Sequence, residues 1–230
     1  MALSGELVTV ETRSGDVFPP PGVDVVVFDV VGTLVEPSPS VALAYQRAAA
    51  RHGVEDDVAG IQSRFRAAWK RQEEIDAAAS PPFATSRARE ADRWRRIVDE
   101  VFAGQPASGA IFADLWEHFG RVDAWRPIER GRELVRRAIE ARATVVLASN
   151  FDERLFRIAG RMEPLCWADE VFPSAEIGWR KPAPQFFRWI ERRLGRPPER
   201  MLLVGDDPLL DIAAARRSGW RALPITDDAG

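Results

Sequence analysis

The sequence predicts an α/β fold with a Rossmann-like, doubly wound parallel sheet as its core and an inserted α-helical bundle. Two observations support this prediction. Short apolar runs typical of buried strands alternate with helical patterns from residue 143 onward. In addition, 120 positions separate Asp29, after the first apolar run, from Ser149, after the second. A βαβ unit needs only about 30 residues, so the surplus predicts a second domain within the first.

The first 22 residues form an N-terminal extension with little pattern. A short strand over Leu7 to Thr12, closing a small hairpin, fits this segment, and so does a loose tail. The run Pro19-Pro20-Pro21-Gly22 predicts a stiff, extended spacer that separates the extension from the core.

Residues 23 to 35, VDVVVFDVVGTLV, open the predicted core. Their β-branched and aromatic residues form an apolar run without helical spacing, which is typical of a parallel strand buried on both faces. The run ends at Asp29, and Gly32 predicts a turn three residues later. Ligand sites of α/β proteins lie at the carboxyl ends of such strands. Asp29 is therefore a candidate functional residue as well as a candidate turn cap.

Residues 36 to 126 predict a helical domain. After a loop, Ser40 can cap a helix that begins near Val41. Further helices are predicted by apolar stripes: Phe65, Ala68, Trp69, Gln72 and Ile75; Trp94, Ile97, Val98, Val101 and Phe102; and Ile111, Leu115, Trp116 and Phe119. Such stripes bury one another in a bundle, so we expect the tryptophans in its core and the many arginines on its solvated face. An insertion at this end of the sheet can act as a lid.

Residues 127 to 230 return to the core, and predicted strands and helices alternate along them. The predicted strands are 144–148, 171–172, 201–204 and 220–224. The predicted helices are 129–142, one that starts at Asp152, one that opens at Lys181-Pro182 and runs through Leu194, and 209–218. Proline suits the first turn of the third of these helices.

Composition excludes several classes of protein. A net charge of −3 argues against a nucleic-acid binder, which needs a basic excess. The sequence has no run of 18 apolar residues and no secretory signal at its start, so we expect a cytoplasmic protein without a membrane span. Cys166 is the only cysteine, which excludes an internal disulfide and a multi-thiolate metal site. We expect its side chain to be buried as a small hydrophobe beside Leu165 and Trp167.

Polar groups follow the predicted strands or lie in adjoining loops: Asp29, Ser149-Asn150, Lys181, and Asp206-Asp207 with Asp211. In an open parallel sheet they line one crevice. Asp29 and Asp206 would repel each other there unless a cation lies between them. Oxygen ligands without His or Cys suit Mg²⁺, which also binds a substrate's phosphate. The predicted chemistry is a carboxylate that attacks an electrophile while a metal and a lysine neutralise charge.

In this order, FDVVGTL, LASN, RKPAPQFF and VGDDPLLD resemble the four signature motifs of the haloacid dehalogenase-like hydrolase superfamily. The resemblance covers roughly residues 23 to 224, and the helical insert is similar to that family's first cap class. It implies a hydrolase whose core comprises residues 23–35 and 127–230, with a cap over residues 36–126. The implied substrate is a small phosphorylated molecule.

The resemblance also implies a role for each matching residue. Asp29 would be the nucleophile that forms an aspartyl intermediate, and Thr33 would support its loop at the substrate site. Ser149 and Asn150 would bind the transferring group, and Lys181 would steady its negative charge. The implied ligands of Mg²⁺ are Asp29, the main-chain carbonyl of Val31, Asp206 and Asp211.

Val31 departs from the family pattern. Family phosphatases usually carry at this position a second aspartate, which protonates the leaving group and activates water. Such help is worth about 10²–10⁴-fold, so we expect poor turnover of ordinary alkyl phosphates. Leaving groups that need no proton, such as halide, phosphate or an acyl group, escape this handicap.

Three hypotheses therefore stay open: a Mg²⁺-dependent phosphatase of low activity, a metal-independent 2-haloacid dehalogenase, and a binding or regulatory module with little turnover. Family dehalogenases also lack the second aspartate, but they lack the acidic fourth motif as well. Asp206 therefore favours phosphoryl chemistry.

Two histidines lie near the predicted ends of helices in the insert. We expect His52 and His118 to interact with the helix dipole, in preference to replacing the missing acid. Tyr45 and Arg47 lie on the first helix of the insert, from which a long side chain can reach the crevice.

Overall fold

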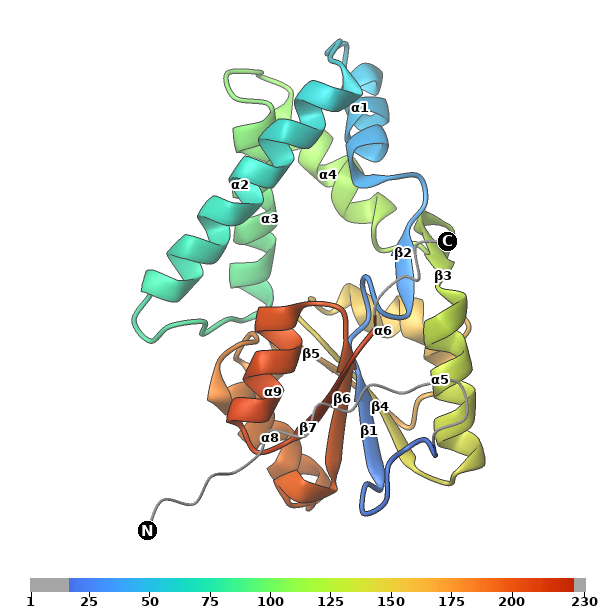
Figure 1. The fold of residues 1–230 in the computed structure, drawn as a ribbon. Helices are drawn as coiled ribbons and strands as arrows, with labels where there is room; N and C mark the ends of the chain where they lie inside the picture. The colour runs from blue at the N-terminus through green and yellow to red at the C-terminus, as the bar shows by residue number, and fades with distance from the viewer. Residues whose placement is uncertain (1–16, 226–230) are drawn as a thin grey trace.

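The computed structural model describes residues 17–225, so the predicted strand at Leu7 to Thr12 lies outside the described residues. Its centre is a five-stranded parallel sheet with the order β5-β4-β1-β6-β7 (Figure 1). The strands are β1 Val25–Phe28, β4 Thr144–Ser149, β5 Glu170–Pro173, β6 Met201–Gly205 and β7 Arg221–Pro224. Strand β1 lies in the middle, with Phe28 between Leu147 and Val204. The predicted parallel α/β core is confirmed.

Helices cover both faces of the sheet. Because side chains alternate along a strand, Val26 and Phe28 pack on one face and Val25 and Val27 on the other. The first face is covered by α5 (Glu129–Glu140) and α6 (Arg154–Ala159), and the second by α8 (Pro184–Leu194) and α9 (Ala214–Arg217). All four residues of β1 are buried, which explains why its sequence is apolar at every position.

Four helices form a separate layer beyond the carboxyl end of β1 (Figure 1). They are α1 Val41–Arg51, α2 Val58–Ala78, α3 Arg87–Val101 and α4 Ser108–His118, and we call them the helical cap. They enclose a hydrophobic cluster of their own that includes Ile61, Ile97 and Ile111. As predicted, the Ser40 hydroxyl caps α1 by accepting a hydrogen bond from the amide of Leu43.

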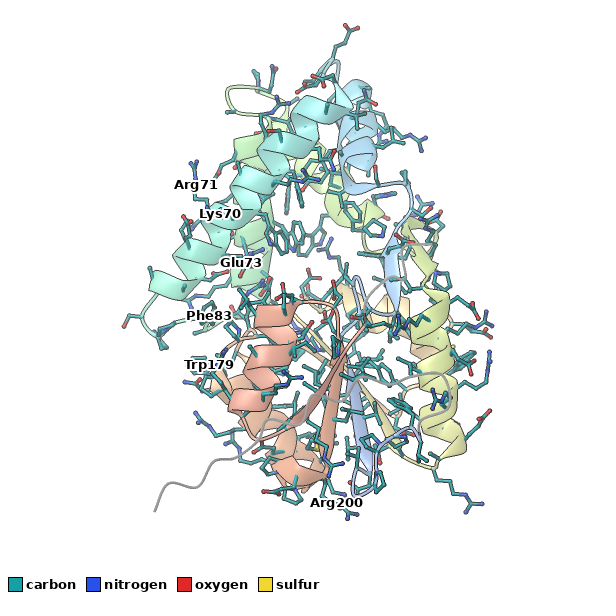
Figure 2. The ribbon with its side chains drawn as sticks, in the orientation of Figure 1. Lys70, Arg71, Glu73, Phe83, Trp179 and Arg200 are labelled. Carbon is teal, nitrogen blue, oxygen red and sulfur yellow. The ribbon has the colours of Figure 1, made fainter. Side chains whose placement is uncertain are left out.

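Two segments join the cap to the core. Strands β2 (Val35–Pro37) and β3 (Trp125–Pro127) pair antiparallel where the chain enters and leaves the cap. The sequence predicted a loop between Val35 and Ser40 and no strand at either segment. At a second junction the amide of Arg180 donates to the carbonyl of Phe83, close to Trp179 (Figure 2).

Several predicted boundaries were wrong. Helix α8 begins at Pro184 instead of Lys181-Pro182, and the short helix α7 (Ser174–Ile177) was missed. The last helix is divided into a π-helical segment, Pro208–Ala213, and α9. A π-helical turn often occurs at functional sites, and this one carries Asp211.

Two expectations about individual side chains were also wrong. Phe18 is buried in the core cluster, with the Arg137 guanidinium 5.3 Å from its ring centroid, and Pro19 is also buried, so the chain already packs on the core before the exposed turn at Pro21 and Gly22. Cys166 is exposed, because the short helical turn Leu165–Trp167 turns Leu165 inward instead. Within residues 17–225, no helix combines the length and the apolar character that a membrane crossing needs.

Candidate active site

A cavity of about 440 Å³ is lined both by the helical cap and by the loops at the carboxyl ends of the strands. This volume is typical of small-molecule sites. The core contributes Asp29 after β1, Ser149 and Asn150 at the end of β4, Lys181 before α8, and Asp206, Asp207 and Asp211 after β6. The polar residues that the sequence predicted to share one crevice are therefore together.

Lys181 connects two of the carboxylates. Its ammonium Nζ donates to Asp29 Oδ1 at 2.6 Å and also to Asp211 Oδ1, and all three side chains are buried. Backbone hydrogen bonds position both carboxylate residues, and the amide of Asp211 donates to the carbonyl of Asp207 at 3.1 Å. The amide of Asp29 donates to the carbonyl of Val204 at 2.9 Å, which continues the hydrogen bonding of β1 with β6.

Asn150 fixes the backbone of Lys181 from the end of β4. Its Oδ1 accepts from the Lys181 amide at 2.7 Å, and its Nδ2 donates to the Lys181 carbonyl at 3.0 Å. An asparagine supplies both a donor and an acceptor, as this pairing requires. Asn150 also lines the cavity, so it can contact a ligand as well as hold Lys181.

Burial and charge together perturb the titration of these groups. Burial alone would lower the pKa of Lys181, but the charges of Asp211 and Asp29 raise it above its ordinary value. Burial raises the pKa of Asp29, and the Asp206 charge adds to the rise, although Lys181 opposes it. Burial likewise raises the pKa of Asp211 to about 6. One ammonium therefore faces three carboxylates, and this excess of negative charge favours a bound cation.

Carboxylate oxygens of Asp29, Asp206 and Asp211 all lie within 4.8 Å of one another. Two glycines permit this approach. A side chain at Gly32, which has φ +86°, would overlap the Asp206 carboxylate, and one at Gly205 would overlap that of Asp211. An all-oxygen set of this kind suits a hard divalent cation such as Mg²⁺.

The remaining predicted residues lie nearby but differ in what they contact. Ser149 lines the cavity, and its hydrogen bond to Asp29 acts to lower the pKa of that carboxyl. Val31 also lines the cavity. Thr33 does not, because its hydroxyl lies behind the site and donates to Asp206 Oδ1 at 3.1 Å. This contact suits a supporting role better than the predicted contact with substrate.

Sequence reasoning missed most of the aromatic lining of the cavity. The aromatic residues along it are Tyr45, Phe65, Trp69, Trp94, Phe112, Trp116, Phe119, Trp125 and Phe151. Trp69 and Trp94 pack against the cap cluster, as expected, but they also face the cavity. A helical stripe predicts which residues turn away from water, and it does not distinguish a core from a cavity wall. Tyr45 reaches the cavity, whereas Arg47, His52 and His118 are not part of its lining.

Arg154 was also missed. Two nitrogens of its guanidinium donate to the Asp152 carboxylate at 2.7 and 2.6 Å, and a third donates to the Trp116 carbonyl at 2.9 Å. Its Cζ lies 3.6 Å from the ring centroid of Trp116, so Arg154 connects the core to α4. The close spacing of Asp152 and Arg154 just after Ser149-Asn150 was the available signal. Arg93, expected on a solvated face, is buried against the Trp69 ring.

Comparisons with known proteins agree with this architecture. Residues 23–219 match a family model described as haloacid dehalogenase-like hydrolase. The chain is 26% identical over 204 residues to the human protein "Haloacid dehalogenase-like hydrolase domain-containing protein 3", covering 86% of this chain and 80% of that one.

Solved structures with the same fold include a dehalogenase and a protein described as a predicted phosphatase. A defluorinating L-2-haloacid dehalogenase superposes with a TM-score of 0.71 and 24% identity, covering 90% of this chain and 84% of that one. A predicted phosphoglycolate phosphatase from Haemophilus somnus superposes with a TM-score of 0.63 and 17% identity, covering 89% of this chain and 86% of that one. At these identities the likeness concerns the fold.

Proposed function

This chain belongs to the haloacid dehalogenase-like hydrolase family, and from that premise we propose that it is a Mg²⁺-dependent phosphatase that acts on a small phosphorylated molecule through Asp29. The observation that carries the proposal is the set of buried groups at the strand ends. Asp29 is hydrogen-bonded to Lys181, and Asp206 and Asp211 lie close to both.

The donor set fits Mg²⁺. Asp29, Asp206 and the main-chain carbonyl of Val31 would hold the ion, and Asp211 would support it or its waters. These are oxygen ligands, and their charge exceeds that of Lys181. When bound, Mg²⁺ supplies positive charge that neutralises a phosphoryl group.

The reaction uses residues of the chain as follows. A carboxylate oxygen of Asp29 attacks phosphorus, and the bond from phosphorus to the leaving oxygen breaks with its electron pair on that oxygen. Water then hydrolyses the phospho-Asp29 intermediate and releases phosphate. Lys181 and Ser149 stabilise negative charge on the transferring group, while Asn150 holds Lys181 in place.

A phosphate-release assay tests this proposal. We expect turnover of at least one member of a phosphate-ester panel, dependence on Mg²⁺, and loss of turnover in Asp29→Asn. Asp123→Asn is the control, because Asp123 is an exposed aspartate that pairs with Arg121 and is outside the cavity lining. Phosphate release that is unchanged in Asp29→Asn would reject Asp29 as the nucleophile.

A second candidate function is metal-independent dehalogenation of a 2-haloacid. Val31 cannot act as an acid, and a departing halide needs none; the apolar lining beside Asp29 also suits a haloalkyl carbon. Asp29 would attack that carbon, halide would leave, and water would cleave the resulting ester. Chloride release from 2-chloropropionate in the presence of EDTA, without phosphatase activity, would favour this function over the first.

A further inference from the structure

The two ends of the cavity differ in chemistry. The end formed by the core carries the carboxylates and Lys181. The cap contributes Trp69 and Phe65 from α2, Trp94 from α3, and Phe112 and Trp116 from α4. Apart from the indole N–H groups of the tryptophans, the polar groups among the cap side chains that line the cavity are those of Tyr45 and Arg66. A sugar or another hydroxyl-rich group would lose more hydrogen bonds to water here than these few groups can replace.

Arginines fix two of the tryptophan rings. The Arg93 guanidinium lies 4.4 Å from the Trp69 ring centroid and is bound by Asp76 at 2.9 Å and by Glu73. Arg154 stacks on Trp116 and is held by the carboxylate of Asp152. Because rings held by packed neighbours lose little freedom on binding, they form a preorganised apolar wall.

The same arginines define the charge of a suitable ligand. An aromatic cavity can bind a quaternary ammonium group, but here Arg66 and Arg154 line the cavity and Arg93 lies against one of its rings. These positive charges disfavour a second cation. The guanidinium of Arg154 is already bound by Asp152 and by the Trp116 carbonyl, so it is poorly placed to take a carboxylate from the ligand. Arg66, an exposed residue, is the other arginine of the lining, and the aromatic rings form most of the cap's contribution, so an uncharged apolar group fits this wall best.

We propose that the substrate is a phosphate ester of an uncharged aromatic alcohol, bound with its phosphate at Asp29 and Lys181 and its ring against Trp69, Trp94 and Phe112. This inference rests on the proposed phosphatase function and specifies its substrate class. In the reaction, Asp29 bonds to phosphorus, the bond from phosphorus to the aryl oxygen breaks, and an aryloxide leaves with the electron pair and takes a proton from water. An aryloxide leaves without an acid, so Val31 does not impede this first step of the reaction.

The test compares esters that differ in apolar area but little in leaving-group acidity. In the presence of Mg²⁺, we expect kcat/KM for 2-naphthyl phosphate to exceed that for phenyl phosphate by about 10-fold or more, because the second ring contacts the aromatic wall. Glycerol 3-phosphate should be poorer than both. Faster turnover of glycerol 3-phosphate, with no preference for naphthyl over phenyl, would overturn the inference and leave the phosphatase function standing. Absence of turnover on every ester would overturn the phosphatase function and the inference with it.

Two variants of Trp69 test whether the aromatic wall causes the preference for the naphthyl ester. Trp69→Ala should reduce the naphthyl-to-phenyl ratio toward 1, and Trp69→Phe should restore most of it. Trp167→Ala is the matched control, because Trp167 is also half-buried beneath an arginine, Arg132, but is outside the cavity lining. Should Trp69→Ala fail to fold, Phe112→Ala on α4 makes the same test. An unchanged ratio in both cavity variants would overturn the inference.

Discussion

Glu90 accepts two hydrogen bonds from Arg180 Nη1, at 2.7 and 2.8 Å, and so joins the cap helix α3 to the loop that carries Lys181. Both residues are 1% exposed. Glu90 also accepts from the Thr85 hydroxyl at 2.8 Å, and Arg180 reaches Glu73 at 3.3 Å. This buried network fixes the residue next to Lys181 through contacts with the cap.

Glu90→Gln should destabilise the protein. It removes the carboxylate charge that faces the buried Arg180 guanidinium, while Glu73 and Asp76 remain as partners, so we expect a cost of about 1–3 kcal/mol in the free energy of unfolding. Urea unfolding measures the change. Glu176→Gln is the control, because the Arg87–Glu176 pair also joins α3 to the core but is largely exposed, so its loss should cost at most about 1 kcal/mol.

The same pair should make stability depend on pH. Burial alone would raise the pKa of Glu90, but Arg180 holds that pKa below its ordinary value of 4.5. A carboxyl with a lowered folded pKa stabilises the protein above its unfolded pKa, and this contribution is lost as the pH falls through the folded pKa. The stability difference between wild type and Glu90→Gln should therefore shrink from neutral pH to a pH of about 3. A difference that stays constant would contradict this account.

Val31→Asp should create the missing acid. We expect turnover of an alkyl ester such as glycerol 3-phosphate to rise by about 10²–10⁴-fold. Val31→Asn, similar in size but unable to transfer a proton, should give no such rise. If the native protein already matches Val31→Asp on alkyl esters, Val31 does not limit turnover, and the idea of a binding module with little turnover is excluded.

Mg²⁺ binding should depend on Thr33 as well as on the carboxylates. The Thr33 hydroxyl orients Asp206, and loss of such a supporting hydrogen bond typically weakens metal affinity by about 10–100-fold. Thr33→Val tests this without a large change in volume. The midpoint of thermal unfolding, measured against Mg²⁺ concentration, reports the affinity without requiring turnover. Identical titrations for wild type and Thr33→Val would show that Asp206 needs no such support.

Gly32→Ala should disrupt the acidic cluster. Gly32 and Gly53 both have a positive φ, so alanine costs about 1–3 kcal/mol of backbone strain at either position. At Gly32 the new methyl group would also overlap the Asp206 carboxylate, whereas at Gly53 nothing lies within 4 Å. Both variants should unfold more easily, but only Gly32→Ala should lose Mg²⁺ binding and activity.

Much of the core could be predicted because its signals are local. The apolar run Val25–Phe28 carries no helical spacing, and polar residues follow the strands at Asp29 and Ser149. Parallel pairing alone then brings those residues to one edge of the sheet.

Other features depend on contacts between distant segments. Glu90 and Arg180 are 90 positions apart, and each looks like an ordinary surface charge in the sequence. Strands β2 and β3 contain proline, which usually interrupts a sheet but is tolerated in a short two-stranded ribbon. Trp69 satisfies the helical stripe whether it faces a core or a cavity, so the stripe could not reveal the aromatic wall.

The pairing of β2 with β3 has a consequence for how this protein can be altered. Pro37 lies opposite Trp125, so the chain departs for the cap and returns from it at neighbouring points. A different helical insert could be grafted between these two strands without respacing the sheet, provided that it supplied a carboxylate for Arg180 in place of Glu90. The cap, which would set specificity, could then be exchanged without changing the core, which would break the bond.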